Sequence, residues 1–417
     1  MKYLFPIALV MLLVATPDCL AQQDADVGWG GPDYVPNRIR SDNADKNVLL
    51  PIGLPQSYYD WKAGLQEETG YSFQADYFSV LLNSSNSLPG ADREAGSGVF
   101  RFSGFWELVG RGSDTTGTLI YLVEHRHRYA DTLPQEFSLL NLGNIGAIEI
   151  PFDNDPWHLT NFYWDQVWNA GELQVVAGFL DVTDFVDVHP LTSPWTDFSN
   201  FGFSIGAATM DVPNDAALGV IAGVQLTEKA YIAAGFTDLN PTDPFKGFET
   251  LFNEFYTLVE IGYTTAGRDL YFLNNLHVTL WHTDPRSASG TSEGWGGVLS
   301  FTKSLSERWL VFARGGLSDG GGSLLEKSVS VGFGYQPQLD DELAPADQLG
   351  FGFNWGDPND DLFGSAPNNQ YAIETYYRSQ ITREFSITPS VQLLINPALN
   401  PDKDSLWVFG LRGRIVF

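Results

Sequence analysis

The chain has 417 residues, and its 51 acidic and 23 basic residues give a formal net charge of −28. This balance excludes nucleic acid as a partner, because contacts to phosphates require clustered lysine and arginine. Aromatic residues make up 14% of the chain and charged residues only 18%, with 42 glycines, a composition that favours a large β protein.

The first 21 residues predict an export signal. Lys2 is followed by an apolar run over residues 4–15 and by a candidate cleavage site after Ala21. The run is too short to cross a membrane as a helix. The single cysteine, Cys19, lies in this segment, so its removal leaves no thiol and no disulfide. We expect residues 1–21 to be a cleaved signal peptide and the protein to be exported.

Apolar and polar residues alternate along most of the chain, with the two-residue repeat of a strand, but not near its start. Residues 22–56 show little alternation and are rich in Asp, Asn, Gly and Pro. Beyond Ser57, alternating runs follow one another, with turn-rich stretches between them; the runs are 71–77, 99–109, 118–128, 255–263, 371–380 and 391–396. We expect one strand-rich domain over residues 57–417 and a segment outside it over residues 22–56.

The C-terminal residues 406–417 show the strictest alternation. Trp407, Phe409 and Leu411 share one face, whereas Arg412 and Arg414 lie on the other, and the chain ends on a phenylalanine. An exported chain that closes on such a strand indicates an all-β protein, a transmembrane antiparallel β-barrel in the outer membrane of a Gram-negative-type bacterium. Residues 22–56 would then lie outside the barrel wall.

The number of strands follows from the length of the domain. Residues 57–417, at roughly 20–24 residues for each strand with its links, give about 15–18 strands. Barrels of this kind usually have an even number, so we expect 16 strands, with 18 as the alternative. A soluble β-sandwich would also alternate. The crowding of Tyr, Trp and Phe at strand ends favours the membrane, where such residues form two aromatic girdles.

Several stretches in chain order carry a resemblance to a known family. They are VEHRHRYA at residues 123–130, FYWDQVW at 162–168, GELQVVAGFLDVTDFVDVHPLTSPWTDFSNF at 171–201, FARGGLSDGG at 312–321, and TPSVQLLINPALNPDKDSLWVFGLRGRIVF at 388–417. Together they resemble the carbohydrate-selective porin family of the OprB type. The resemblance implies passive diffusion of mono- and oligosaccharides into the periplasm.

A sugar-selective pore needs side chains that recognise a neutral, hydroxylated solute and still release it. Arginines and carboxylates can hydrogen-bond to hydroxyl groups, and aromatic rings can stack on the C–H faces of the sugar. We therefore expect the following residues to line the pore and contact sugar: Arg101, Glu107, Glu124, Arg126, Arg128, Trp164, Glu374, Tyr376, Arg378, Arg412 and Arg414. The alternative is that these residues form salt bridges that only stiffen the wall.

Residues 181–199 are the expected constriction segment. They lack strand alternation and contain Asp181, Asp184 and Asp187 at a spacing of three, followed by Trp195. From its place in the family-like stretch, this segment is expected to fold into or over the lumen, with a plain external loop as the alternative. The terminal Phe417 is expected to be the signal read by the outer-membrane assembly machinery, and the lipid bilayer is expected to surround the wall.

Other functional classes find less support. The main alternative within transport is a general or anion-preferring porin. An anion-preferring pore would need lumen arginines and lysines without matching acids, which this chain does not show. An outer-membrane barrel hydrolase would need a Ser–His pair at one rim, and an exported β-rich binding protein would need no membrane contact. His125 and His127 share a strand face but lack a third metal ligand nearby. We expect no metal, no cofactor and no enzymatic activity.

Overall fold

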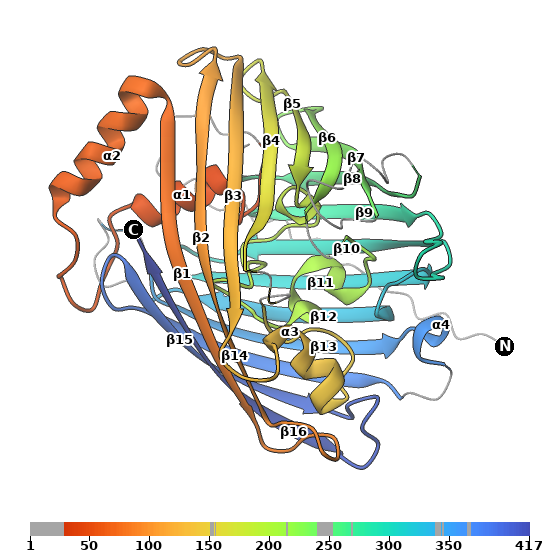
Figure 1. The fold of residues 1–417 in the computed structure, drawn as a ribbon. Helices are drawn as coiled ribbons and strands as arrows, with labels where there is room; N and C mark the ends of the chain where they lie inside the picture. The colour runs from red at the N-terminus through yellow and green to blue at the C-terminus, as the bar shows by residue number, and fades with distance from the viewer. Residues whose placement is uncertain are drawn as a thin grey trace.

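The computed structural model describes residues 29–150, 154, 156–213, 216–239, 253–267, 270–337, 343, 346–364 and 368–417. The expected signal peptide therefore lies outside the described residues. The strands form a closed barrel in which β1 pairs with β16 and every other strand pairs with its neighbours in sequence (Figure 1). All strand pairs are antiparallel, and the barrel has 16 strands, which confirms the predicted number.

The strands follow one another around the wall. They are β1 (Tyr71–Ser84), β2 (Glu94–Val109), β3 (Thr116–Arg128), β4 (His158–Trp168), β5 (Leu173–Leu180), β6 (Ala217–Gln225), β7 (Ala230–Asp238), β8 (Phe255–Thr264), β9 (Asn275–Thr283), β10 (Gly294–Ser304), β11 (Trp309–Gly320), β12 (Leu325–Tyr335), β13 (Gln348–Pro358), β14 (Gln370–Gln380), β15 (Phe385–Ile395) and β16 (Ser405–Val416). Closure pairs the backbone groups of both end strands, which an open sheet would leave exposed to lipid.

The helices are short, and none of them is part of this wall of strands. They are α1 (Val35–Asn43), α2 (Gln56–Thr69), α3 (Pro134–Glu136), η1 (Phe137–Leu142), η2 (Val182–Asp184), η3 (Phe201–Phe203), η4 (Ile205–Ala208) and α4 (Asp360–Phe363). Within the described part of the chain, no helix is long and apolar enough to span a membrane. The first strand begins at Tyr71 rather than near Ser57, because residues 56–69 form α2, which ends at Gly70 in the left-handed region (φ +74°).

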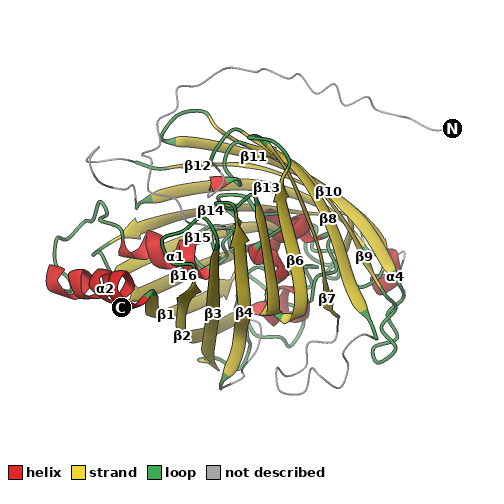
Figure 2. Cartoon of the chain, turned by 90° about the horizontal axis from the view of Figure 1, so that it is seen from above, coloured by secondary structure: helices red, strands yellow, loops and turns green. Residues whose placement is uncertain are grey.

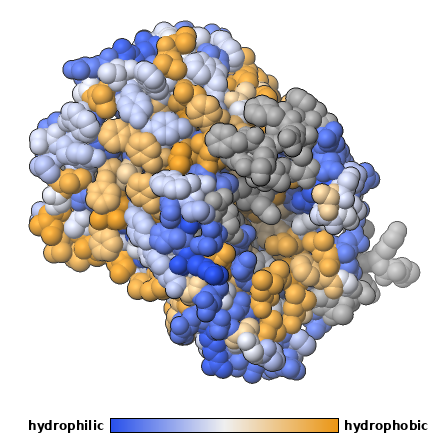
Figure 3. All heavy atoms as spheres, in the orientation of Figure 1, coloured by the Kyte–Doolittle hydropathy of each residue, from blue (hydrophilic) through white to orange (hydrophobic). Residues whose placement is uncertain are grey.

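The last strand shows how alternation sorts side chains between the two faces. Leu411 is 44% exposed on the outer face, whereas its neighbour Arg412 is 2% exposed and points into the barrel. Leu411 pairs with Leu81 of β1 and Pro389 of β15. Exposed large apolar residues recur on most strands, and apolar residues are prominent on the visible face of the molecule (Figure 3). This arrangement reverses that of a soluble barrel and matches a wall that faces lipid.

The two ends of the barrel differ in the length of their links. At the end that holds the C-terminus, several strand pairs are joined by short links, among them 169–172, 226–229, 305–308 and 381–384. At the other end, links such as 129–157 and 181–216 are much longer. Outer-membrane barrels carry short turns on the periplasmic side and long loops outside. The end with the C-terminus and α2 is therefore assigned to the periplasm (Figures 1 and 2).

The inside of the barrel holds chain segments as well as wall side chains. Tyr34, Val35 and Ile39, at and within α1, belong to one buried apolar cluster with Ile120 of β3 and Phe185 of the link 181–216. Figure 2, which views the chain from above, shows α1 enclosed by the strands. The segments that position the candidate site thus come from the N-terminal region and from the longest link in the wall.

Candidate functional site: the charged lumen

On β2 and β3, one carboxylate lies between two arginines. Arg101 and Glu124 lie directly opposite each other in the antiparallel register, and Arg101 Nε is 3.0 Å from Glu124 Oε1. Arg126 Nε donates to Glu124 Oε2 at 2.8 Å from the same face of the strand. All three side chains are buried. The guanidinium group of Arg101 also lies 3.8 Å from the ring centroid of Trp195, so a wall arginine meets the constriction segment directly.

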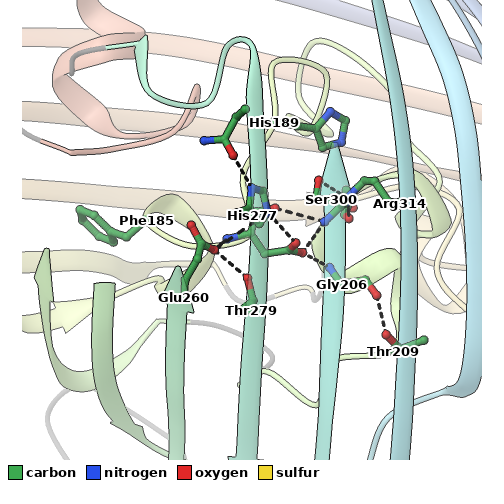
Figure 4. A network of polar contacts seen from close by, with 12 residues as sticks. Phe185, His189, Gly206, Thr209, Glu260, His277, Thr279, Ser300 and Arg314 are labelled. Atoms are coloured by element: carbon green, nitrogen blue, oxygen red, sulfur yellow. Dashed lines mark hydrogen bonds and ion pairs between the residues drawn. The ribbon is translucent and has the colours of Figure 1, made fainter. Parts of the chain in front are cut away.

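The segment 181–199 folds into the lumen rather than outward as a loop. Asp184 and Asp187 are both buried. Asp187 forms an ion pair with Arg314 of β11 and accepts a hydrogen bond from Gly206 N at 2.5 Å (Figure 4). His277 Nε2 of β9 lies 3.2 Å from Asp187 Oδ1. Burial raises the pKa of Asp187, but Arg314 and His277 outweigh burial and bring it to about 2, so the carboxylate is ionised.

A second carboxylate, Glu260 of β8, extends this network along the wall. Its side chain accepts hydrogen bonds from Tyr231 Oη at 2.7 Å and from Thr279 Oγ1 at 2.7 Å. The backbone N–H of Asp187 donates to Glu260 Oε2 at 2.6 Å (Figure 4). The segment 181–199 is therefore held by side chains from β8, β9 and β11, which lie next to one another or two strands apart, and Tyr231 of β7 binds Glu260 in turn.

On the opposite side, β14 and β16 hold the end of the same segment. Glu374 accepts hydrogen bonds from Ser199 N and Asn200 N, both at 3.0 Å. Arg412 donates to the carbonyl oxygens of Pro194 at 2.9 Å and Asp197 at 2.6 Å. The wall on both sides of the lumen thus recognises mainly the backbone and the acidic side chains of the infolded chain.

Tyr376 and Arg378 of β14 also bind the end of the segment 181–199. Tyr376 Oη donates to Asp197 Oδ1 at 3.2 Å, and Arg378 Nη1 donates to the carbonyl oxygen of Thr196 at 3.2 Å. Glu149, in the link before β4, lies 3.9 Å from the Arg412 guanidinium. Burial raises the pKa of Glu149 to about 8, although Arg412 acts in the opposite direction.

Arg414 binds α1 to the wall. Its guanidinium group donates to both oxygens of Asp42, at 3.0 and 2.7 Å, and to Asp76 Oδ2 of β1 at 3.0 Å. Gln74 of β1 donates to the same Asp42 at 2.8 Å. Burial raises the pKa of Asp42, but Arg414 and Lys46 outweigh it and hold the pKa well below its usual range. Asp42 is therefore a permanent anion at the seam between the first and last strands.

Four of the expected site residues lie apart from these contacts. Glu107 is half-buried near the periplasmic end of β2, and Arg128 is exposed at the far end of β3, where it donates to the carbonyl oxygen of Asp131. Asp181 caps the turn at η2 by accepting from Thr183 N at 2.9 Å. The prediction that Trp164 faces the lumen is wrong, because its side chain lies on the outer side of β4, beside Gln166 and opposite Leu119.

The position of Trp164 corrects the expectation that this ring stacks on sugar in the lumen. Its neighbours Tyr163 and Asp165 are buried and point inward, and Asp165 bonds to Tyr34 next to α1. Because side chains alternate along a strand, Trp164 must point outward. The inward charge of Asp165 already indicated this face in the sequence.

Other lumen residues were not singled out from the sequence. Arg314, His277 and Glu260 are buried and bind the infolded segment, and each stands on the polar face of an alternating run. Alternation could have placed them inside the barrel. Arg38 of α1 donates to Ser103 Oγ at 3.1 Å. Alternation could not have placed this residue inside the barrel, because it lies in a helix. No group of three or more His, Cys, Asp or Glu that could hold a metal ion occurs in the described parts of the chain.

A closed barrel with an apolar outer wall, a charged inner wall and a link folded into its lumen defines a porin. The family model of the carbohydrate-selective porin, OprB family, matches residues 126–417. The chain therefore belongs to this family, which confirms the resemblance seen in the sequence. The family and the fold are those of channels rather than enzymes.

Two solved structures have the same fold. The high-pH structure of Pseudomonas putida OprB is 15% identical, with a TM-score of 0.67 over 87% of this chain and 97% of that chain. The low-pH structure of the same protein is 14% identical, with a TM-score of 0.51 over 87% and 98% of the two chains. No curated protein sequence matches this chain.

Proposed function

We propose that this chain is an outer-membrane porin through which neutral mono- and oligosaccharides diffuse passively into the periplasm. The observation that carries the proposal is the lumen itself, where wall arginines lie beside carboxylates around an infolded segment rich in acids and aromatic rings. Paired charges limit the preference for ions of one sign, and they leave a wall dense in hydrogen-bond donors and acceptors. A neutral solute with many hydroxyl groups can exchange hydrogen bonds with such a wall.

In this proposal the sugar meets residues from three places. The wall of β2 and β3 contributes Arg101, Glu124 and Arg126. The wall on the other side of β1 contributes residues of β14 and β16, namely Glu374, Tyr376, Arg378, Arg412 and Arg414. The segment 181–199 supplies Asp184, Asp187 and Trp195 and sets the narrowest part of the passage. The salt bridges described above also stiffen the wall, which is the alternative role expected from the sequence.

The anion-preferring alternative gains no support from the lumen. Such a pore requires arginines and lysines that exceed the acids around them. Here Arg101 and Arg126 share Glu124, Arg314 pairs with Asp187, and Arg414 contacts two carboxylates.

Conductance in planar bilayers tests the proposal. The variant Arg126→Gln with Arg378→Gln removes one cation from β3 and one from β14, and Arg308→Gln, in an exposed turn, is the matched control. We expect the double variant to conduct cations more strongly, because Glu124 and Asp197 lose partners. We also expect glucose-like sugars to block its current less than that of the parent protein.

The outcome that contradicts the proposal is equally clear. If the double variant and Arg308→Gln show the same ion preference and the same sugar block, the lumen arginines serve the wall alone. If the parent protein in vesicles shows no sugar flux, the proposed function itself fails. Each variant must first show the heat-modifiable migration of a folded barrel.

Targeting and assembly complete the proposal. The signal peptide at residues 1–21 is cleaved on export, so N-terminal sequencing of protein from outer membranes should begin at Gln22. Phe417 is the end that the assembly machinery recognises. It also closes the barrel, because its N–H donates to the carbonyl oxygen of Ala75 at 2.7 Å.

A further inference from the structure

An exposed apolar surface lies at the periplasmic rim, outside the wall of strands. The stretch before α2 exposes Leu49, Leu50, Ile52 and Leu54, and α2 itself exposes Trp61, at 53%. Single exposed apolar residues are ordinary on protein surfaces, but a contiguous group is not. These residues follow one another along one end of the barrel, from the turn between β14 and β15 to the start of β1.

Backbone and side-chain contacts hold this stretch against the rim. The N–H groups of Leu49 and Leu50 donate to the carbonyl oxygens of Gln380 and Ile381 at 3.0 and 2.8 Å. Just before α2, the N–H of Leu54 donates to Glu384 Oε1 at 2.9 Å. Further along the helix, Tyr59 Oη donates to the same oxygen at 2.6 Å. The apolar side chains are exposed even though their backbone is fixed, so their exposure is a property of the folded rim.

The apolar side of α2 continues the aromatic belt of the wall. Trp61 packs edge-on against Phe73 of β1, with ring centroids 6.0 Å apart. Phe73 in turn contacts Tyr71 and Phe102 on the outer face of the barrel, at 5.9 and 6.1 Å. Lys62 is 5% exposed and lies over the rings of Tyr58 and Phe73, so its stem covers apolar surface. The helix therefore touches the wall where an aromatic girdle meets the membrane interface.

The faces of α2 are sorted as in a helix that lies flat on a membrane. Residues spaced three and four apart on a helix share a face, which places Tyr58, Trp61 and Leu65 of α2 together; Leu54 lies in the stretch just before the helix. Asp60 and Glu67 are exposed on the other face, whereas Glu68, three residues after Leu65, is exposed at the C-terminal end of the apolar face. An interfacial helix buries its apolar face among acyl chains and keeps its polar face in water.

We propose that residues 49–65 form an interfacial anchor that binds the phospholipid of the periplasmic leaflet and continues the aromatic girdle beyond the wall of strands. Continuity with the lipid-facing wall favours a bilayer as the partner, because Trp61 and Phe73 belong to one surface. The anchor rests on the outer-membrane location of the barrel but not on its choice of solute. It lies across the periplasmic end of β16, between the β14–β15 turn and β1.

A fluorescent probe at single cysteines tests this anchor. In a Cys19→Ser background, Trp61→Cys and Leu54→Cys place an environment-sensitive probe on the apolar side, and Asp60→Cys places it on the polar side as the matched control. The three proteins are refolded into phosphatidylcholine vesicles, some containing phosphatidylcholine with a spin label near the head group. Heat-modifiable migration confirms that each barrel is folded.

We expect the probes at 61 and 54 to emit at shorter wavelength than the probe at 60 and to be quenched by spin-labelled lipid. The probe at 60 should instead be quenched by iodide in the water phase. Equal iodide quenching at all three positions, without lipid quenching, overturns the anchor. Energy transfer between labelled chains that replaces lipid quenching also overturns it, because the occupant is then a second copy. Loss of sugar flux with lipid quenching retained counts against the proposed function alone.

Discussion

Replacement of Leu411 by arginine should destabilise the barrel by an amount that depends on membrane depth. Leu411 lies near the middle of β16, on the outer face, and is 44% exposed. An arginine that faces lipid at mid-bilayer costs roughly 2–4 kcal/mol, and this cost falls to about 0–1 kcal/mol near the interface. Ser405, the first residue of the same strand, lies on the same face and provides the matched control Ser405→Arg. The expected difference in unfolding free energy between the two variants is about 2–3 kcal/mol.

This difference corresponds to a change of roughly 30- to 150-fold in the unfolding equilibrium constant, which denaturant titration in lipid vesicles can measure. Tryptophan fluorescence reports the transition, and refolding from denaturant must give the same curve. If Leu411→Arg and Ser405→Arg unfold with equal free energies, then either position 411 does not face lipid or the strand crosses the membrane at another depth. The first explanation would refute the assignment of Leu411 to the outer face, and the second would refute its assigned depth in the membrane.

Three further outcomes follow from the lumen and the seam. Deletion of Phe417 should lower the amount of barrel in the outer membrane, measured by quantitative blotting of membrane fractions, and a normal level would contradict its role in assembly. Arg412→Leu should leave the barrel heat-modifiable but speed limited proteolysis within residues 181–199, because two backbone carbonyl oxygens lose their donor; equal cleavage rates would contradict this. Since the pKa of Asp187 is lowered to about 2 by Arg314 and His277, its stabilisation is complete above about pH 4 and is lost as the pH falls towards 2. Proteolysis at acidic pH should show this loss in the parent protein and not in Asp187→Asn, and identical pH profiles would contradict it.

Alternation made the wall of the barrel predictable from sequence. On β16, Trp407, Leu411 and Arg412 lie on the faces that the two-residue repeat assigns to them. Such an assignment needs only the neighbouring residues of the same strand. The number of strands was narrowed to 16 or 18 by the length of the domain and by the usual even number of strands, because membrane thickness sets the length of each strand. The error at Trp164 had a different origin: a large aromatic ring suits either face, and only its charged neighbour Asp165 decides which face it takes.

The filling of the lumen was less accessible to sequence analysis. Asp187 pairs with Arg314, 127 residues away in sequence, and Glu374 binds Ser199, 175 residues away. No periodicity connects such partners, because each pair depends on how a link without strand pattern folds inside a closed wall. The presence of α1 in the lumen has the same cause. Its residues 35–43 contain one proline and several charges, and contacts to β1, β2 and β3, together with Arg414 of β16, fix their place.

The triple contact of Arg414 has a consequence for the folding of the chain. This one guanidinium group joins β16 to Asp76 across 338 residues and to Asp42 across 372 residues. Contacts of such long separation are the slowest to form, because the chain must close a very large loop before they bring any gain. None of them exists until the final strand has been made and placed. Closing the wall and seating the N-terminal helix inside it are therefore coupled through a single side chain, so the step that completes the barrel also completes its interior.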